Sequence, residues 1–366
     1  MTLPQVAAST VPRIPLEEWY ARDHRGWSRV PLAQLPTRVH RLGHWSSALG
    51  AEVWIKRDDE TSSLYGGNKP RKLEFLLGEV QRRGYRAVLT FGGLGTHHGL
   101  ATAVFARELG LRVLLGLLYQ PVTPAVRENL LCLHALGARL FYGASVPALV
   151  WGTLRELWVE WLQRSVPYII PTGGTSPVGT LGYVNAGLEL AEQIRRHEVP
   201  SPAYIFVPLG SGGTVAGLSL AMRLAGLPSK VVGVLVTDIF PPSAVRLLRL
   251  AQKTARLIGP EAVTMARAMS ARDFVIERDF VGGGYGQALP AADQLAAWFR
   301  AVEGIELDAT YTAKTAYALD QTVRAGRWGR GPFLFWLTFS RVRIADRLQP
   351  LPDFRELPAS FHKFFA

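Results

Sequence analysis

Residues 64–77 read LYGGNKPRKLEFLL, in which two glycines are followed at once by a lysine and then by an apolar run. Gly66 and Gly67 allow a tight turn or the close approach of a ligand. Pro70 suits the first turn of a helix, and the apolar residues beyond it predict a helix that packs on a core. We therefore expect Lys69 where a glycine turn meets a helix start, with Lys72 on the same side of that helix.

The residues alone leave two interpretations of Lys69 open. The first is a solvated surface lysine that happens to lie beside a turn. The second is an amine that forms a Schiff base with an aldehyde cofactor. Spacing does not decide between them.

The stretch resembles the lysine motif of the aminocyclopropane-carboxylate deaminase and D-cysteine desulfhydrase family, which contains pyridoxal-phosphate (PLP) enzymes. The preceding residues 54–59, WIKRDD, are similar to the strand that leads into that motif. The resemblance implies that Lys69 carries the cofactor, that Asn68 contacts it and that Lys72 pairs with its phosphate. Lys72 as the anchor in place of Lys69 is the alternative within this interpretation.

Composition limits the class of protein. A chain of 366 residues, 48% of them hydrophobic, predicts two domains or one large α/β unit. No apolar run approaches the roughly 20 residues of a membrane span, and the N-terminus lacks a signal-peptide pattern. The single cysteine, Cys132, excludes an internal disulfide, and we expect a cytoplasmic protein.

The formal net charge of +12 raises the question of nucleic-acid binding. The basic residues are scattered, however, and no nucleic-acid-binding module is recognisable, so no nucleic-acid partner is predicted. A generally basic surface favours anionic substrates and cofactors.

After an irregular lead-in of about 50 residues, strand-like and helix-like segments alternate along the chain. Predicted strands lie at 53–56, 87–91, 112–118, 139–142, 168–171, 204–208, 231–237, 274–277 and 333–337. Predicted helices in the first half lie at 71–83, 96–109, 124–136 and 147–163. Such alternation implies parallel sheets with helices on both faces.

The resemblance adds a domain plan and a fold. It implies the tryptophan-synthase-β-like fold (fold type II), with two open parallel-sheet domains and the active site in the cleft between them. Residues 1–71 and 171–366 would form a discontinuous PLP-binding domain, and residues 72–170 a small α/β domain. It also implies a homodimer.

The predicted helix at 147–163 carries an apolar stripe at helical spacing. Such a stripe is typical of a buried core position. A contact between domains or subunits is the alternative. The residues of the stripe are Trp151, Leu154, Trp158, Trp161 and Leu162.

Residues 91–99, FGGLGTHHG, form a glycine-rich turn that opens a helix, where free backbone N–H groups favour an anion such as a carboxylate. Thr96 could instead simply cap that helix. In the family a serine contacts substrate here and an asparagine pairs with the cofactor's phenolic oxygen. Thr96 and His97 stand at those places, so a hydroxyl is kept and an imidazole N–H replaces the amide. No further ligands converge on the two adjacent histidines, so no metal is predicted.

Residues 206–217, FVPLGSGGTVAG, run from a strand through glycines into a helix, a pattern that cradles phosphate. A dinucleotide turn is the alternative, with Asp238 as the ribose-binding acid, but Val215 stands where that motif needs glycine or alanine. The segment resembles the phosphate loop of fold-type-II PLP enzymes. The cofactor-binding residues implied there are Ser211, Gly212, Gly213 and Thr214. A second glycine loop, residues 170–183, is either beside the cofactor or a plain connection.

Three later segments also resemble the family. Residues 282–287 and 307–314 would bring Tyr285 and Tyr311 to the substrate, where a phenol can orient it or transfer a proton; interfacial core tyrosines are the alternative. Thr312 stands where cyclopropane deaminases have glutamate and D-cysteine desulfhydrases have threonine. Thr338 would face the pyridine nitrogen, although Phe339 and Ser340 replace the family's glycines.

The resemblance predicts a PLP-dependent lyase or deaminase that acts on a small amino acid. Lys69, Thr96, Tyr285 and Tyr311 are the predicted catalytic residues. We expect β-elimination from D-cysteine or a related D-amino acid to a keto acid, ammonia and, for cysteine, sulfide. The alternatives are a diverged member with weak or different activity, including cyclopropane-carboxylate deamination, and a nicotinamide-dependent enzyme in which Lys69 has no role.

Overall fold

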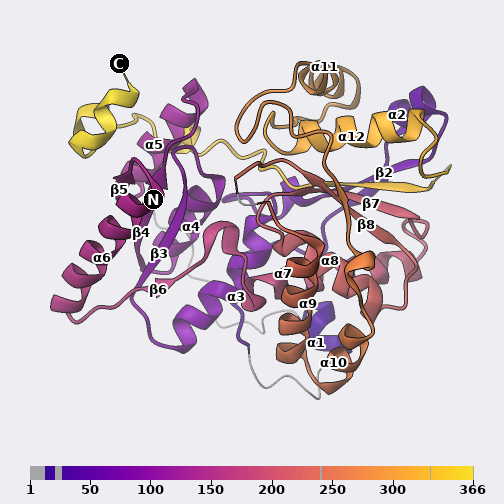
Figure 1. Cartoon of the computed structure of the whole chain (residues 1–366), viewed down its shortest axis with the longest axis horizontal. Coiled ribbons are helices and arrows are strands. Elements are labelled where there is room, and N and C mark those ends of the chain that lie inside the picture. The colour runs from indigo at the N-terminus through magenta and orange to yellow at the C-terminus, as the bar shows by residue number, and fades with distance from the viewer. Residues whose placement is uncertain (1–12, 21–26, 240, 330, 366) are drawn as a thin grey trace.

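The computed structural model describes residues 13–20, 27–239, 241–329 and 331–365. These residues form two sheets that lie beside each other, each with helices on both faces (Figure 1). No helix in the described ranges combines the length and apolarity needed to cross a bilayer. The residues in which a signal peptide was sought, at the extreme N-terminus, lie outside the described ranges.

The larger sheet has six strands, and all neighbouring pairs are parallel except the first. The central strands β10, β7 and β8 are near-continuous apolar runs, as expected for a sheet covered on both faces. In order across the sheet they are β1 (Val39–Arg41), β2 (Val53–Arg57), β10 (Phe333–Leu337), β7 (Tyr204–Leu209), β8 (Lys230–Leu235) and β9 (Val275–Glu277).

Two groups of helices cover this sheet (Figure 1). One face packs on α1 (Pro15–Trp19), α7 (Pro177–Arg195), α8 (Gly213–Leu224), α9 (Ala244–Ile258) and α10 (Pro260–Arg267). The other face packs on α2 (Gly43–Leu49), α11 (Pro290–Trp298) and α12 (Thr312–Arg324). Alternate side chains of the central strands divide between these two cores, with Leu334 and Trp336 of β10 in the first and its two phenylalanines in the second, which places β10 and β7 in the middle of the domain.

The smaller sheet is parallel throughout, in the order β5 (Arg139–Gly143), β4 (Arg112–Leu118), β3 (Ala87–Gly93) and β6 (Tyr168–Ile169). One face packs on α3 (Lys69–Arg82), α4 (His97–Glu108) and α5 (Pro124–Ala135). The other face packs on α6 (Val146–Leu162). The C-terminal turns η5 (Ala345–Arg347), η6 (Phe354–Glu356) and η7 (Ala359–Phe364) return to the first of these faces.

Helix α3 links the two parts. Its apolar side joins the core of the smaller sheet through Leu73, Leu76 and Leu77. Its opposite side meets α7 so closely that a Cβ on Gly182 would lie 2.0 Å from the carbonyl oxygen of Arg71. Only glycine fits there, so the helix that begins with Lys69 is held between both parts.

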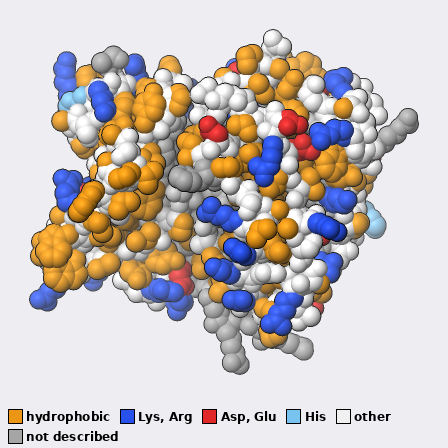
Figure 2. All heavy atoms as spheres, viewed as in Figure 1, with side chains coloured by type: hydrophobic (Ala, Val, Ile, Leu, Met, Phe, Trp, Pro, Cys, Tyr) orange, Lys and Arg blue, Asp and Glu red, His pale blue; other side chains and the backbone are white. Residues whose placement is uncertain are grey.

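The structure confirms the α/β class, the parallel sheets with helices on both faces, and each predicted strand and helix to within a few residues. Two expectations were wrong. Residues 39–49 are not irregular, because they form antiparallel β1 and helix α2. The α6 stripe is not core: its apolar side chains are exposed, and Figure 2 shows hydrophobic side chains crowded where Figure 1 places α6.

Candidate active site

The glycine turn before Lys69 is fastened to the ends of two central strands. The amide of Gly67 donates to the carbonyl oxygen of Asp58, just beyond β2, at 2.7 Å. The amide of Asn68 donates to the carbonyl oxygen of Thr338, just beyond β10, at 3.1 Å. Gly67 has φ 84°, and a Cβ there would lie 2.6 Å from that same Thr338 oxygen, so no larger residue fits. Lys69 therefore starts α3 at the carboxyl edge of the larger sheet.

The amine of Lys69 has an unusual environment for a lysine. Its Nζ donates to Asn68 Oδ1 at 2.8 Å. Burial lowers the pKa of Lys69 to about 8, an effect that the charge of Asp308 partly opposes. An amine that loses its proton near neutral pH is a competent nucleophile for an aldehyde. The geometry therefore supports the second interpretation of Lys69 over a solvated surface lysine.

The buried amine of Lys72 lies among polar groups. Its Nζ donates to the carbonyl oxygen of Gly173 at 3.2 Å, and burial and a neighbouring ammonium lower the pKa of Lys72 well below its usual range. The buried hydroxyl of Thr180 has no hydrogen-bond partner among the described residues. A Cβ on Gly213 would lie 3.2 Å from Lys72 Nζ and 3.0 Å from Thr175 Oγ1.

These observations test whether a phosphate group fits. The buried amine of Lys72, the Thr180 hydroxyl without a hydrogen-bond partner among the described residues, and the space left by the missing Cβ of Gly213 all lie at the start of α8. The first backbone N–H groups of that helix have no intrahelical partner, and its dipole favours an anion. A phosphate would satisfy all of these groups, so the residues present fit the phosphate of PLP.

The rest of the predicted phosphate loop surrounds the same place. Gly212 caps α8 with φ 96°, and a Cβ there would lie 2.6 Å from a side-chain carbon of Leu247. Ser211 Oγ lies 2.6 Å from Thr175 Oγ1, which joins this loop to the second glycine loop. Thr214 is buried in the first turn of α8. The loop at residues 170–183 is thus beside the candidate cofactor site rather than a plain connection.

His97 pairs with a residue that sequence reasoning missed. Tyr65 Oη lies 2.8 Å from His97 Nδ1. Burial raises the pKa of Tyr65, so its phenol keeps its proton. Burial lowers the pKa of His97, so its imidazole is neutral and only one of its two ring nitrogens carries a proton. With the phenol donating to Nδ1, that proton is on Nε2, where it could act in place of the amide of the family's asparagine.

Thr96 caps helix α4, which is one of the two roles predicted for it. Its Oγ1 accepts a hydrogen bond from the amide of Gly99 at 3.1 Å and so caps α4. A hydroxyl that accepts at the cap still has its own proton to donate. Capping and contact with a substrate carboxylate are therefore compatible.

The two predicted tyrosines contact each other. Tyr285 Oη and Tyr311 Oη lie 2.6 Å apart, and burial raises the pKa of both phenols. The carboxylate of Asp308 accepts hydrogen bonds from the amide of Tyr311 at 2.8 Å and from the hydroxyl of Thr312 at 2.7 Å. The Thr312 hydroxyl is thus bonded to Asp308. Because Asp308 also holds the amide of Tyr311, Thr312 would influence a ligand by fixing the position of Tyr311.

Asp238 holds the other tyrosine loop. Its Oδ1 accepts a hydrogen bond from the amide of Tyr285 at 2.9 Å, and Lys314 Nζ donates to the carbonyl oxygens of Val281 at 2.6 Å and Gly284 at 3.2 Å. The acid that the dinucleotide interpretation assigns to a ribose is therefore occupied by the tyrosine loop. That interpretation finds no support in the geometry.

The two departures from the family pattern meet in space. The ring of Phe339 lies edge-on to the ring of His97, with centroids 6.0 Å apart. Ser340 Oγ accepts a hydrogen bond from the amide of Gly66 at 3.0 Å, so the serine that replaces a glycine holds the Lys69 turn. Phe339 therefore contacts a predicted site residue, and Ser340 contacts the turn that precedes Lys69.

The predicted residues from separate loops converge on one region. Contacts join Thr338 to Asn68 and Lys72 to Gly213, while electrostatic effects join Lys69 to His97. Asp308 acts on the pKa of Lys69, His97 and both tyrosines, so these groups surround one carboxylate. The region lies beyond the carboxyl ends of parallel strands, where ligands of open α/β sheets bind. No cluster of metal-ligating side chains occurs among the residues described.

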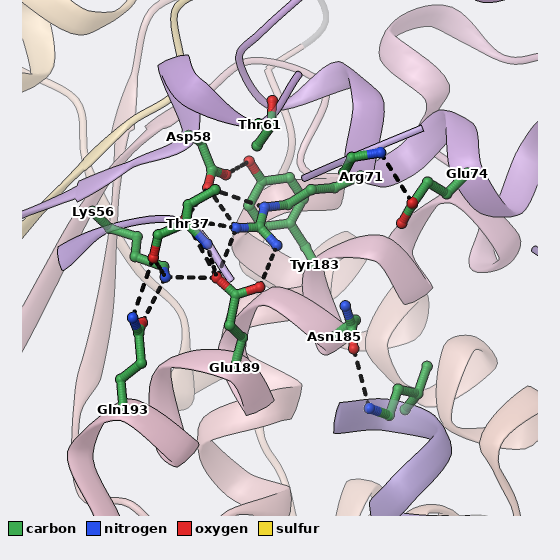
Figure 3. A network of polar contacts seen from close by, with 12 residues as sticks. Thr37, Lys56, Asp58, Thr61, Arg71, Glu74, Tyr183, Asn185, Glu189 and Gln193 are labelled. Atoms are coloured by element: carbon green, nitrogen blue, oxygen red, sulfur yellow. Dashed lines mark hydrogen bonds and ion pairs between the residues drawn. The ribbon is translucent and has the colours of Figure 1, made fainter. Parts of the chain in front are cut away.

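A buried ionic network lies directly behind this region (Figure 3). Arg71 donates to Asp58 Oδ1 at 2.7 Å and to Glu189 Oε2 at 2.9 Å, and Lys56 donates to Glu189 Oε1 at 2.6 Å. Tyr183 completes the carboxylate of Asp58 with a hydrogen bond to Oδ2 at 2.7 Å. The charges of the two cations balance those of the two carboxylates. The network joins β2, α3 and α7 close to Lys69, the first residue of α3.

Comparisons with known proteins agree with this geometry. The family model described as pyridoxal-phosphate dependent enzyme matches residues 30–338. The chain is 34% identical to nocardicin C-9′ epimerase of Nocardia uniformis subsp. tsuyamanensis over 334 residues, which cover 88% of this chain and 96% of that protein. It is 32% identical to D-cysteine desulfhydrase of Salmonella choleraesuis over 314 residues, which cover 84% and 92% of the two chains.

A solved structure also resembles this one. The crystal structure of a homologue of aminocyclopropane-carboxylate (ACC) deaminase superimposes with a TM-score of 0.76 and 30% identity, covering 91% of this chain and 98% of that one. Family, fold and phosphate cradle agree on the cofactor, which is pyridoxal phosphate. The chain therefore belongs to the family of pyridoxal-phosphate-dependent enzymes of fold type II.

Proposed function

We propose that this protein is a PLP-dependent lyase or deaminase that removes the β-substituent of a small amino acid, with D-cysteine or a related D-amino acid as substrate. The observation that carries the proposal is the Lys69 amine, whose pKa is lowered to about 8 at the start of α3. The relative named D-cysteine desulfhydrase supports the choice of substrate.

Each part of the cofactor has residues that would hold it. Lys69 would bind it covalently, with Asn68 alongside. Lys72 and residues 211–214 would bind its phosphate. His97 Nε2–H would donate to its phenolic oxygen, and the hydroxyl of Thr338, at the end of β10, would face its ring nitrogen. When bound, the cofactor supplies an electron sink that makes the Cα proton of the substrate acidic.

The remaining steps belong to the chain's own side chains. Thr96 would donate its hydroxyl proton to the substrate carboxylate at the start of α4. The amine of Lys69, once exchanged for the substrate amine, would accept the Cα proton. The bonded pair of Tyr285 and Tyr311 would orient the β-substituent, with one phenol free to protonate it as it leaves. For D-cysteine, the overall reaction would convert cysteine and water into pyruvate, ammonia and hydrogen sulfide.

A second candidate reaction has a specific observation in its favour. The relative named as an epimerase is matched over 96% of its length. Proton removal from one face of Cα and return to the other can use two proton carriers, and Lys69 and the tyrosine pair would be the candidates. Epimerisation would therefore use this same site without loss of the β-substituent. Cyclopropane-carboxylate deamination remains the third candidate.

A substrate panel separates these reactions. We expect D-cysteine to have the highest kcat/KM among both enantiomers of cysteine, serine and β-chloroalanine and the cyclopropane amino acid. Keto acid, ammonia and sulfide should form in equal amounts. Inversion or deuterium exchange at Cα without keto acid would assign epimerisation instead, and keto acid from the cyclopropane substrate alone would assign deamination.

Lys72→Met should weaken the binding of pyridoxal phosphate by about 10–100-fold, the value of one charge-assisted hydrogen bond of about 1.5–3 kcal/mol. Unphosphorylated pyridoxal should bind the variant and the wild type equally. Absorbance titration of the apoprotein measures both. Lys230→Met, at an exposed lysine that begins β8, is the control. Equal losses for both ligands would contradict the phosphate assignment.

The lowered pKa of Lys69 predicts a pH dependence for cofactor attachment. Below the pKa the amine is protonated and cannot attack the aldehyde, so the rate should rise with pH and level off above about 8. Stopped-flow absorbance of apoprotein mixed with pyridoxal phosphate measures this rate. For Nα-acetyl-lysine, whose side-chain amine is free, the rate should keep rising until the pH reaches about 10.4, the pKa of an ordinary lysine. A protein profile that matched free acetyl-lysine would contradict the assignment.

We further propose that the protein is a cytoplasmic homodimer. The lone, buried thiol of Cys132 suits a reducing compartment. We also propose residues 72–170 as the small domain and residues 1–71 with 171–366 as the large one. All strands of the smaller sheet lie within 87–169, which supports this division, although the C-terminal turns pack on the small-domain core.

A further inference from the structure

Helix α6 carries an apolar face that none of the described residues covers. Its most exposed side chains are Trp151 at 73%, Leu162 at 61%, Trp158 at 60%, Trp161 at 57%, Val150 at 52% and Leu154 at 51%. The three tryptophans alone expose on the order of 400 Å². Figure 2 shows hydrophobic side chains crowded where Figure 1 places this helix. Contiguous apolar patches of this size on folded proteins usually mark an interaction surface.

The position of α6 suits contact with an extended, flat surface. The helix has 17 residues and is about 25 Å long. It lies at the outer edge of the smaller sheet, with its buried side against β4 and β5 and its apolar face outward (Figure 1). A helix in this position forms a convex ridge, and the whole length of a ridge can rest on a plane.

The residue types on the face are those of helices that lie in a membrane interface. Such helices have Trp and Leu on one side and basic residues along the borders of that side. Tryptophan is enriched at the boundary between lipid and water, because its ring is apolar while its N–H can bond to headgroups or water. On α6, Arg155 lies one helical turn from both Trp151 and Trp158. This pattern favours a lipid surface as the partner of the face.

The charges around the face favour a lipid surface that is anionic. Both glutamates of α6 are buried, whereas the four arginines that flank the helix are exposed. Four arginines against two glutamates leave a net charge of +2, on a chain whose formal net charge is +12. The arginines are Arg112, Arg139, Arg155 and Arg164, and the glutamates are Glu156 and Glu160.

A second copy of the chain suits this face less well. Contact of two α6 helices across a twofold axis would bring the arginines of one chain towards those of the other, and like charges would oppose each other. A bilayer with anionic headgroups is instead attracted by each excess positive charge. The charge balance therefore favours a lipid surface over a second chain.

From the apolar face, its position and its charge balance we propose that α6 docks the protein on the surface of an anionic lipid bilayer. The helix lies in the plane of the interface, with its tryptophans at the level of the headgroups and its arginines beside the lipid anions. Helix α6 covers the face of the smaller sheet opposite α3 and α4, so docking leaves the Lys69 region uncovered. This proposal is separate from the substrate and from the pairing of chains proposed above.

Cosedimentation of the cofactor-loaded, full-length chain with lipid vesicles tests the proposal. Vesicles of phosphatidylcholine with about 30 mol% phosphatidylserine should bind about 25-fold more tightly than phosphatidylcholine alone, because each of the two excess charges contributes about fivefold. Salt at about 0.5 M should remove this preference by screening. Arg155→Gln should weaken binding about fivefold on the anionic vesicles and leave the neutral ones unaffected. Arg267→Gln, at an exposed arginine of α10, is the matched control and should bind as the wild type does.

A change to the apolar face should weaken binding to both kinds of vesicle. Trp158→Glu places a carboxylate among the tryptophans and should weaken binding at least about tenfold. Val245→Glu, at an exposed apolar residue of α9, is the control and should leave binding unchanged. Circular dichroism should show the wild-type fold for both variants, because both sites are exposed.

A fluorescent label on the face gives an independent result. Leu154→Cys can be labelled with an environment-sensitive dye, because the only native cysteine, Cys132, is buried. Its emission should shift to the blue when anionic vesicles are added, and the emission of labelled Val245→Cys should not. Wild-type protein that binds neither kind of vesicle, or binding unchanged by both Trp158→Glu and Arg155→Gln, would overturn the proposal. A blue shift that grew with protein concentration without vesicles would also overturn it, because a second chain would then cover the face.

Discussion

Lys69→Ala should abolish covalent attachment of pyridoxal phosphate and lower turnover of the amino-acid substrate by about 10²–10⁴-fold, the range for loss of a positioned proton carrier. The reason is that Lys69 combines a lowered pKa, about 8, with a position at the tip of the glycine turn. Mass spectrometry after borohydride reduction is the measurement. In the wild type, fragmentation should assign the added pyridoxyl mass to Lys69, and the variant should carry none.

Lys72→Met is the matched control for this experiment. At saturating cofactor it should retain the pyridoxyl mass on Lys69, because its defect concerns the phosphate alone. If the mass were found on Lys72, or persisted in Lys69→Ala, the anchor would be assigned to the wrong amine. The two variants together therefore separate the covalent role from the electrostatic one.

The course of the chain was largely predictable, because the buried parallel strands are short apolar runs bounded by glycine and proline. The β7 run, YIFVPL, and the β10 run, FLFWL, stand out by composition alone. Strand β1 was missed because its three residues, Val39–Arg41, are polar or half-exposed and gain their place only by pairing with β2. For helix α6 the periodicity was predicted correctly, but its burial was not. Periodicity alone does not show whether another part of the protein covers the apolar side of a helix.

Some residues of the candidate site could be predicted from the sequence, and others could not. Glycines at 67, 212 and 213 were recognisable, because a positive φ or a close approach leaves no other choice and so marks the sequence. Tyr65 and Ser340 were not, because a hydroxyl that meets a partner far along the chain has no local signature. His97 pairs across 32 residues and Ser340 across 274. Only the structure shows that Tyr65 engages the imidazole of His97 at Nδ1.

The network behind the site supports a second large effect. Burial alone would raise the pKa of Glu189, but Arg71 and Lys56 outweigh it and lower the pKa to about 2. Glu189→Gln removes one charge and leaves two buried cations facing a single carboxylate, Asp58. Breaking a buried ion pair in this way costs about 3–5 kcal/mol, because the remaining charge is uncompensated. We therefore expect the free energy of unfolding at pH 7 to fall by about that amount.

The pH dependence of stability makes this prediction specific to the carboxylate. A folded pKa below the unfolded value of 4.5 adds stability that is complete above that pH and is lost as the pH falls toward about 2. Glutamine does not titrate, so the difference between wild type and Glu189→Gln should shrink over that range. Urea unfolding between pH 7 and 3 measures it. Glu306→Gln, in an exposed pair with Arg300, should change stability by less than about 0.5 kcal/mol. A constant difference at every pH would mean that the glutamate acts by packing and not by its charge.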